Sequence, residues 1–118
     1  MPGRAVEAAA FIVLFAASGP ACRRERKQEG PPYSAARGVV DRHCVGCHSE
    51  RPTVPAFPIA PCGLVLDTAD LMQQHAARIK LRVVQQRNMP LLNKSGMTDD
   101  ERALIGAWVD SGAIGPRS

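Results

Sequence analysis

The motif Cys44-Val45-Gly46-Cys47-His48 constrains this chain more than any other stretch of its sequence. Two thiols three residues apart lie on the same face of a helical turn, and an imidazole follows the second thiol directly. This arrangement is the attachment signature of c-type haem, in which each thiol can form a thioether with one haem vinyl group. We therefore expect Cys44 and Cys47 to hold one covalent haem c, with His48 as the proximal iron ligand.

The length of the chain makes a bound cofactor important for stability. It has 118 residues, which is one small domain at most. A domain of this size buries little apolar surface and often needs a covalent or metal staple. A covalent haem would be such a staple, because it is a large, flat apolar group at the centre of the fold.

Residues 1–21 resemble a bacterial signal peptide. A weakly positive start precedes the apolar run Ala8–Ala17, which is too short to span a bilayer but suits the core of a signal. Small residues then lead to Cys22, which we expect to be lipidated as the first residue of a lipoprotein. Plain cleavage near Ser18 or Ala21 and an uncleaved anchor are the alternatives. Each of the three places the domain on the far side of the membrane.

The segment after the signal is expected to be a tether. Residues 22–32 are charged, end in Gly and Pro, and show no apolar periodicity, which is typical of a solvated linker. The folded domain is therefore predicted to cover residues 33–115.

Three main helices are predicted in this domain, which is then all-α. The first runs from Tyr33 to Cys44, and the second runs from about Ala69 to Gln86 or Asn88. The apolar face of the second helix carries a residue at every fourth position, and its opposite face is polar. The apolar positions are Leu71, His75, Ile79 and Val83, and the polar face includes Gln73, Arg78 and Arg82.

The third helix has clear signals at both ends. Thr98-Asp99-Asp100-Glu101 is a capping box with acidic residues where the helix dipole favours them. The helix is expected to continue to about Ser111, and Gly112 is a natural C-terminal stop. Its apolar stripe includes Trp108.

A second axial ligand would close the iron site, and the candidates are Met89, Met72, Met97, His75 and His43. We favour Met89 because it lies just beyond the second helix and Pro90 forces the segment out of helical geometry. Its thioether is a soft ligand for haem iron. The alternative for Met89 is a gap-filling role in the core. Met97 is expected to pack, and His43 is expected to point to solvent or to a haem propionate.

Other uses of the cysteines are less consistent with the pattern. A zinc site would need Cys62 and a histidine as a second close ligand pair, which the spacing does not provide. A redox CxxC would need a strand–turn–helix context, which is not visible. We expect Cys62 to be a small buried residue, with pairing or reaction of its thiol as the alternative.

As a set, these motifs resemble class I c-type cytochromes. The similarity rests on Cys44–His48, Met89-Pro90 and a capped C-terminal helix that carries Trp108, and it covers about Tyr33 to Ala113. The resemblance implies an all-α class I cytochrome c fold with three to four helices around a covalently attached haem. It also implies that the N- and C-terminal helices cross, with Trp108 near the crossing.

A closer resemblance is to the C-terminal cytochrome c domain of membrane-anchored bacterial urate oxidases. It rests on four stretches: 42–48, 63–68, 89–91 and 96–104. In that family the domain passes electrons from the oxidase to the respiratory chain.

We therefore expect an electron carrier rather than an enzyme, periplasmic or tethered to a membrane, that carries single electrons on a haem with His/Met ligation. Its expected partners are an oxidase or dehydrogenase as donor and a respiratory-chain component as acceptor. The formal net charge of +4 is scattered, so nucleic acid is not expected as a partner. The alternative is a haem-based enzyme, or a gas or redox sensor with a weak or displaceable distal ligand.

Overall fold

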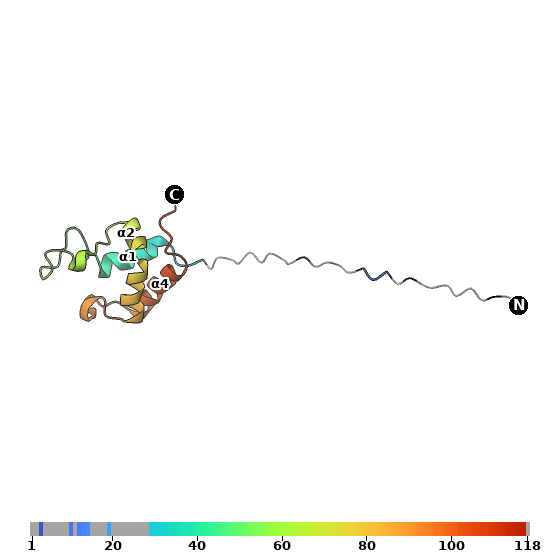
Figure 1. Ribbon diagram of the computed structural model, residues 1–118. Helices are drawn as coiled ribbons and strands as arrows, with labels where there is room; N and C mark the ends of the chain where they lie inside the picture. The colour runs from blue at the N-terminus through green and yellow to red at the C-terminus, as the bar shows by residue number, and fades with distance from the viewer. Residues whose placement is uncertain (1–2, 4–9, 11, 15–18, 20–28, 118) are drawn as a thin grey trace.

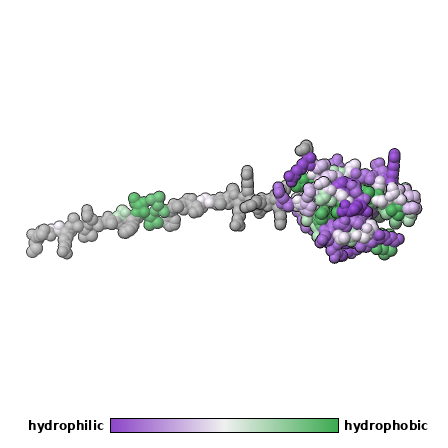
Figure 2. Space-filling model, turned by 180° about the vertical axis from the view of Figure 1, so that it is seen from behind, coloured by the Kyte–Doolittle hydropathy of each residue, from purple (hydrophilic) through white to green (hydrophobic). Residues whose placement is uncertain are grey.

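The computed structural model describes residues 29–117, together with residues 3, 10, 12–14 and 19. Most of the predicted signal peptide and tether, including Cys22, therefore lies outside the described residues. Within the apolar run, Ile12, Val13 and Leu14 are exposed and stand out as an apolar patch in Figure 2. In the described part of the chain, no helix is long and apolar enough to cross a membrane.

The described residues form helices and no strand, as Figure 1 shows, so the all-α prediction is confirmed. The longest helices stand at the two ends of the domain. In chain order the elements are α1 (Tyr33–His43), η1 (Pro61–Gly63), α2 (Ala69–Gln74), α3 (Ala76–Lys80), the π-helical turn η2 (Leu81–Gln85), η3 (Leu91–Asn93) and α4 (Asp99–Asp110).

The core forms where α1 packs against α4 and where α4 packs against α3 and η2. From α1 it takes Ala36, Val39 and Val40, all almost fully buried. From α4 it takes Ile105 and Trp108. The Trp108 ring is completely buried, and its Nε1 donates to the Ile114 carbonyl at 3.0 Å, so its one polar atom is satisfied.

The second predicted helix is not continuous, which corrects the sequence-based expectation. It is interrupted at His75, where φ is −102° and ψ is 10°, and continues as α3. Its last turn then widens to a π-turn, in which the Gln86 N–H donates to the Leu81 carbonyl at 2.8 Å. A wider turn no longer follows the spacing of 3.6 residues from which the two faces of this helix were assigned.

Both predicted ends of α4 are confirmed. The Thr98 hydroxyl accepts from the Glu101 N–H at 3.1 Å, and the Glu101 carboxylate accepts from the Thr98 N–H at 3.0 Å. At the other end, Gly112 has a φ of 106°, a left-handed conformation that favours glycine. The Ala113 N–H donates to the Trp108 carbonyl and the Gly112 N–H to the Val109 carbonyl, which is the Schellman arrangement.

The chain just before α1 also contacts the end of α4. A Cβ placed on Gly30 would lie 2.0 Å from Ser111 Oγ, so this approach requires glycine. The predicted start of the domain at residue 33 stays a prediction. Gly30, which belongs to the predicted tether, already packs against the end of α4.

Replacing Trp108 tests the importance of the core between the terminal helices. Trp108→Ala should lower the free energy of unfolding by about 3–5 kcal/mol, because it removes a fully buried ring. Trp108→Phe keeps a ring and loses the bond to Ile114, so its cost should be nearer about 1 kcal/mol. Urea unfolding of both variants measures this difference. If both variants lost little free energy of unfolding, and by the same amount, the Trp108 ring would not be a main contributor to the core.

Candidate functional site

The CxxCH motif forms a tight turn at the C-terminal end of α1. The Cys44 carbonyl accepts from the Cys47 N–H at 3.2 Å and from the His48 N–H at 2.8 Å. The Thr53 and Val54 N–H groups fold back onto the Gly46 carbonyl at 2.8 and 3.1 Å. Both thiols and the imidazole therefore belong to a single closed turn, whose backbone is held from inside and from the following loop.

Two hydrogen bonds hold His48 to the segment before α2. Its Nδ1 lies 3.1 Å from the Leu64 carbonyl, and its own carbonyl accepts from the Leu66 N–H at 2.9 Å. Because a carbonyl only accepts, this contact assigns the proton to Nδ1. In the neutral ring, Nε2 then keeps its lone pair, which is the form in which a histidine binds a metal.

A mostly apolar cavity adjoins this histidine, and two of the three other predicted haem-site residues line it. They are Cys44, which belongs to the same turn as His48, and Met89, which lies in the loop after η2. Cys47 lies on the same turn but is not among the lining residues. The rest of the wall consists of Pro61, Cys62, Leu64, Leu66, Arg78, Ile79, Arg82 and Val83.

The other candidates for the second axial position lie elsewhere. Met72 is fully buried in the core, and its sulfur lies 3.1 Å from Arg37 Nη1. Met97 is 4% exposed, so the prediction that it packs is confirmed. Neither residue lines the cavity, and the same is true of His75 and His43. Among the five candidates, the structure brings Met89 alone to the cavity that contains His48.

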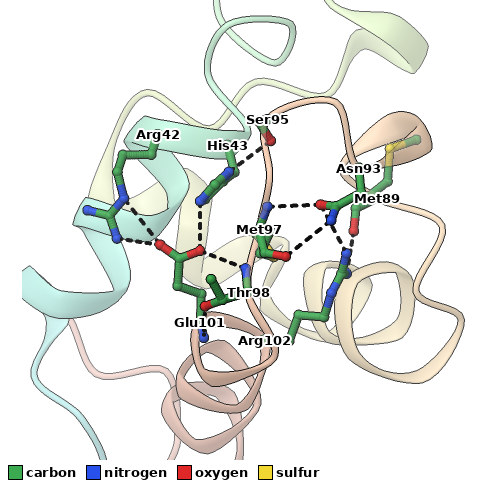
Figure 3. Close-up of polar contacts among 9 residues, drawn as sticks. All are labelled: Arg42, His43, Met89, Asn93, Ser95, Met97, Thr98, Glu101 and Arg102. Carbon is green, nitrogen blue, oxygen red and sulfur yellow. Dashed lines mark hydrogen bonds and ion pairs between the residues drawn. The ribbon is translucent and has the colours of Figure 1, made fainter.

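The prediction for His43 is wrong. Its side chain is 6% exposed and is bonded within the protein, with Nδ1 2.8 Å from Ser95 Oγ and Nε2 2.9 Å from Glu101 Oε2. Figure 3 shows Glu101 between His43 and Arg42, whose Nη2 donates to Oε1 at 2.8 Å. The end of α1 is thus fastened to the first turn of α4, one residue before Cys44.

The electrostatics of the first cysteine do not suit an exposed redox thiol. Desolvation by burial raises the pKa of the Cys44 thiol to about 12, although Arg37 acts in the opposite direction. Reactive cysteines of CxxC oxidoreductases have the opposite shift, because the thiolate is the nucleophile. Cys44 therefore has the environment of a thiol enclosed in a cavity wall.

Cys62 differs from its predicted state. The residue is exposed rather than buried, and its thiol is free. It lies in the short turn η1 with a φ of 57°, directly before Gly63 with a φ of 64°. Two successive left-handed residues make a tight reversal at the surface, which the apolar character of cysteine does not reveal.

Two arginines on the cavity wall were not identified from the sequence. Arg78 and Arg82 were assigned to the polar face of the second helix, yet both line the cavity. The signal that could have found them is their spacing of four residues, which places both on one side of the helix. Cationic side chains at the edge of an apolar cavity can bind the carboxylates of a cofactor.

Among the described residues, no group of three or more His, Cys, Asp or Glu side chains lies together as a metal site would require. No family model matches this chain, and no curated protein or solved structure matches it significantly.

The ion pairs of Glu101 predict how stability changes in acid. The Thr98 N–H, the Arg42 guanidinium and His43 lower the pKa of Glu101 to about 2. A carboxylate with a lowered pKa stabilises the fold fully above its unfolded value, and this contribution is lost as pH falls toward 2. Glu101→Gln should therefore remove part of the loss of stability between about pH 4.5 and 2.

Thermal unfolding across this pH range, on wild type and variant, measures the effect. Asp100→Asn is the matched control, since Asp100 belongs to the same helical turn and forms no ion pair within the described residues. An acid transition that is the same in Glu101→Gln and wild type would contradict the role of this carboxylate.

Proposed function

We propose that this protein carries single electrons on one covalently attached haem c, as a class I c-type cytochrome does. The observation that carries the proposal is the shared cavity of Cys44, His48 and Met89. These residues come from two segments far apart in the chain, and they are the residue types that hold a c-type haem on its two faces.

The residues fit this cofactor in their chemistry. Cys44 and Cys47, three residues apart on one turn, would each hold the haem edge through a thioether. His48 would present Nε2 to the iron, with its ring fixed by the Leu64 carbonyl at 3.1 Å. When bound, haem would supply an iron centre that takes up and releases one electron. The protein's part is to hold that centre and exclude water from it.

Met89 would be the second axial ligand. A thioether is a soft, neutral ligand that favours the ferrous state and so raises the reduction potential. It would also occupy the position at which dioxygen or peroxide could otherwise bind, which favours electron transfer over catalysis. This is the reason to prefer a carrier to an enzyme.

The walls of the cavity would set the environment of the cofactor. Leu64, Leu66, Ile79 and Val83 offer apolar surface that disfavours water. Arg78 and Arg82 would offer charge-assisted hydrogen bonds to the propionates. A small domain with an apolar cavity would gain a substantial share of its stability from the bound haem.

The predicted leader places this carrier outside the cytoplasm, in the periplasm and tethered through lipidated Cys22. A redox protein, either an oxidase or a dehydrogenase, would be the donor, and a component of the respiratory chain would be the acceptor. These proposals rest on the sequence, since Cys22 and its surroundings lie outside the described residues.

Met89→Ala tests the axial assignment. The variant should lose the absorption band of ferric Met ligation, have a lower reduction potential, and bind carbon monoxide rapidly in the ferrous state. Met97→Leu is the control, because it changes a buried methionine off the cavity and should keep the band. A band that survives in Met89→Ala would contradict the assignment. Carbon monoxide binding by wild type as rapid as that of Met89→Ala would instead support an enzyme or sensor.

A further inference from the structure

Arg102 is the buried charged residue of the described chain. It lies on α4 with 5% of its surface exposed, and none of the ion pairs within the described residues involves it. Its Nη1 donates to the Val83 carbonyl and to the Met89 carbonyl, at 2.8 Å each. Its Nη2 lies 3.4 Å from Asn93 Oδ1. Figure 3 shows the guanidinium directed at the Met89–Asn93 loop.

A guanidinium in this position lowers the stability of the fold compared with an apolar side chain, so stability by itself does not explain it. Burying a cation without a carboxylate is unfavourable, and Arg102 Nε has no partner in the structure. A Leu or Met side chain would fill the same space without a charge to desolvate. What arginine adds is a rigid set of donors that can bond several acceptors at once.

Those acceptors belong to two segments, the π-turn η2 and the loop that follows it. Val83 is part of the cavity wall, and Met89 is the proposed distal ligand. Asn93 extends the link, because its Oδ1 accepts from the Met97 N–H at 2.9 Å and its Nδ2 donates to the Met97 carbonyl at 3.2 Å. One side chain therefore fixes the backbone of Met89 relative to both the wall and the base of its loop.

Helix α4 is a firm support for this contact. Its first turn is closed by the Thr98–Glu101 capping box, and Glu101 binds Arg42 and His43 just before the CxxCH turn. Glu101 therefore holds the end of α1 that leads into the CxxCH turn, and its neighbour Arg102 holds the loop that carries Met89.

We infer that Arg102 is the positioning residue for Met89: it holds the backbone of this loop so that the thioether stays on the iron. The inference rests on the proposed function. Methionine is a weak, neutral ligand on a loop, so its bond to iron depends on how much of the loop's freedom is removed in advance. Without Arg102, the loop samples open positions and other ligands compete with Met89 more easily.

Imidazole binding to the ferric haem-loaded protein tests this inference. In Arg102→Gln the affinity for imidazole should rise by about tenfold or more, since the variant loses charged hydrogen bonds to Met89. Arg102→Lys should lie between wild type and Arg102→Gln, because it keeps a charged donor but not the planar fork. Arg87→Gln is the matched control: it removes a nearby surface cation that is bonded to Asp99, and it should bind imidazole as wild type does.

Each outcome decides between the possible roles. An imidazole affinity equal to that of wild type, in an Arg102→Gln protein that is only less stable to heat, would overturn the inference and leave a structural role. If Arg102→Gln yields no haem protein, Arg102→Lys carries the same test, and unchanged affinity there overturns it. A wild-type protein without the Met-ligation band would instead refute the proposed function, which the inference requires.

Discussion

The carboxylate of Glu101 is the contact on which the arrangement of the site depends. Oε2 accepts from the Thr98 N–H, which starts α4, and from His43 at the end of α1, while Oε1 accepts from Arg42. Because Cys44 follows His43 directly, this carboxylate fixes the start of the CxxCH turn relative to α4. The next residue, Arg102, binds the Met89 carbonyl. One turn of one helix therefore places both sides of the cavity.

Features within a single turn of chain could be predicted from the sequence. The spacing of Cys44–His48 indicated the turn, Thr98 and Glu101 indicated the capping box, and Gly112 indicated the helix end, because each depends on neighbouring residues alone. The role of Pro90 placed Met89 outside the helix, and the structure puts this residue on the cavity with His48. Ligation of iron by Met89 stays a prediction.

Contacts between distant residues could not be predicted in this way. His43 meets a partner 58 residues away, and the burial of Arg102 depends on carbonyls of two other segments. Arg82 lines the cavity although the 3.6-residue spacing placed it on the polar face, and a π-turn lies in the same segment. Cys62 is exposed because of a left-handed turn that its residue type does not signal. In each case the tertiary environment outweighs the local pattern.

We propose above all that the cavity lined by His48 and Met89 holds a haem joined covalently through Cys44 and Cys47. The most direct measurement is the intact mass of the full chain after export in a host with a c-type maturation system. The predicted result is a mature polypeptide carrying the added mass of one haem, which persists under denaturing conditions and is absent from a Cys44→Ser, Cys47→Ser double variant. A polypeptide mass without haem, from a protein that was exported and processed, would contradict the claim.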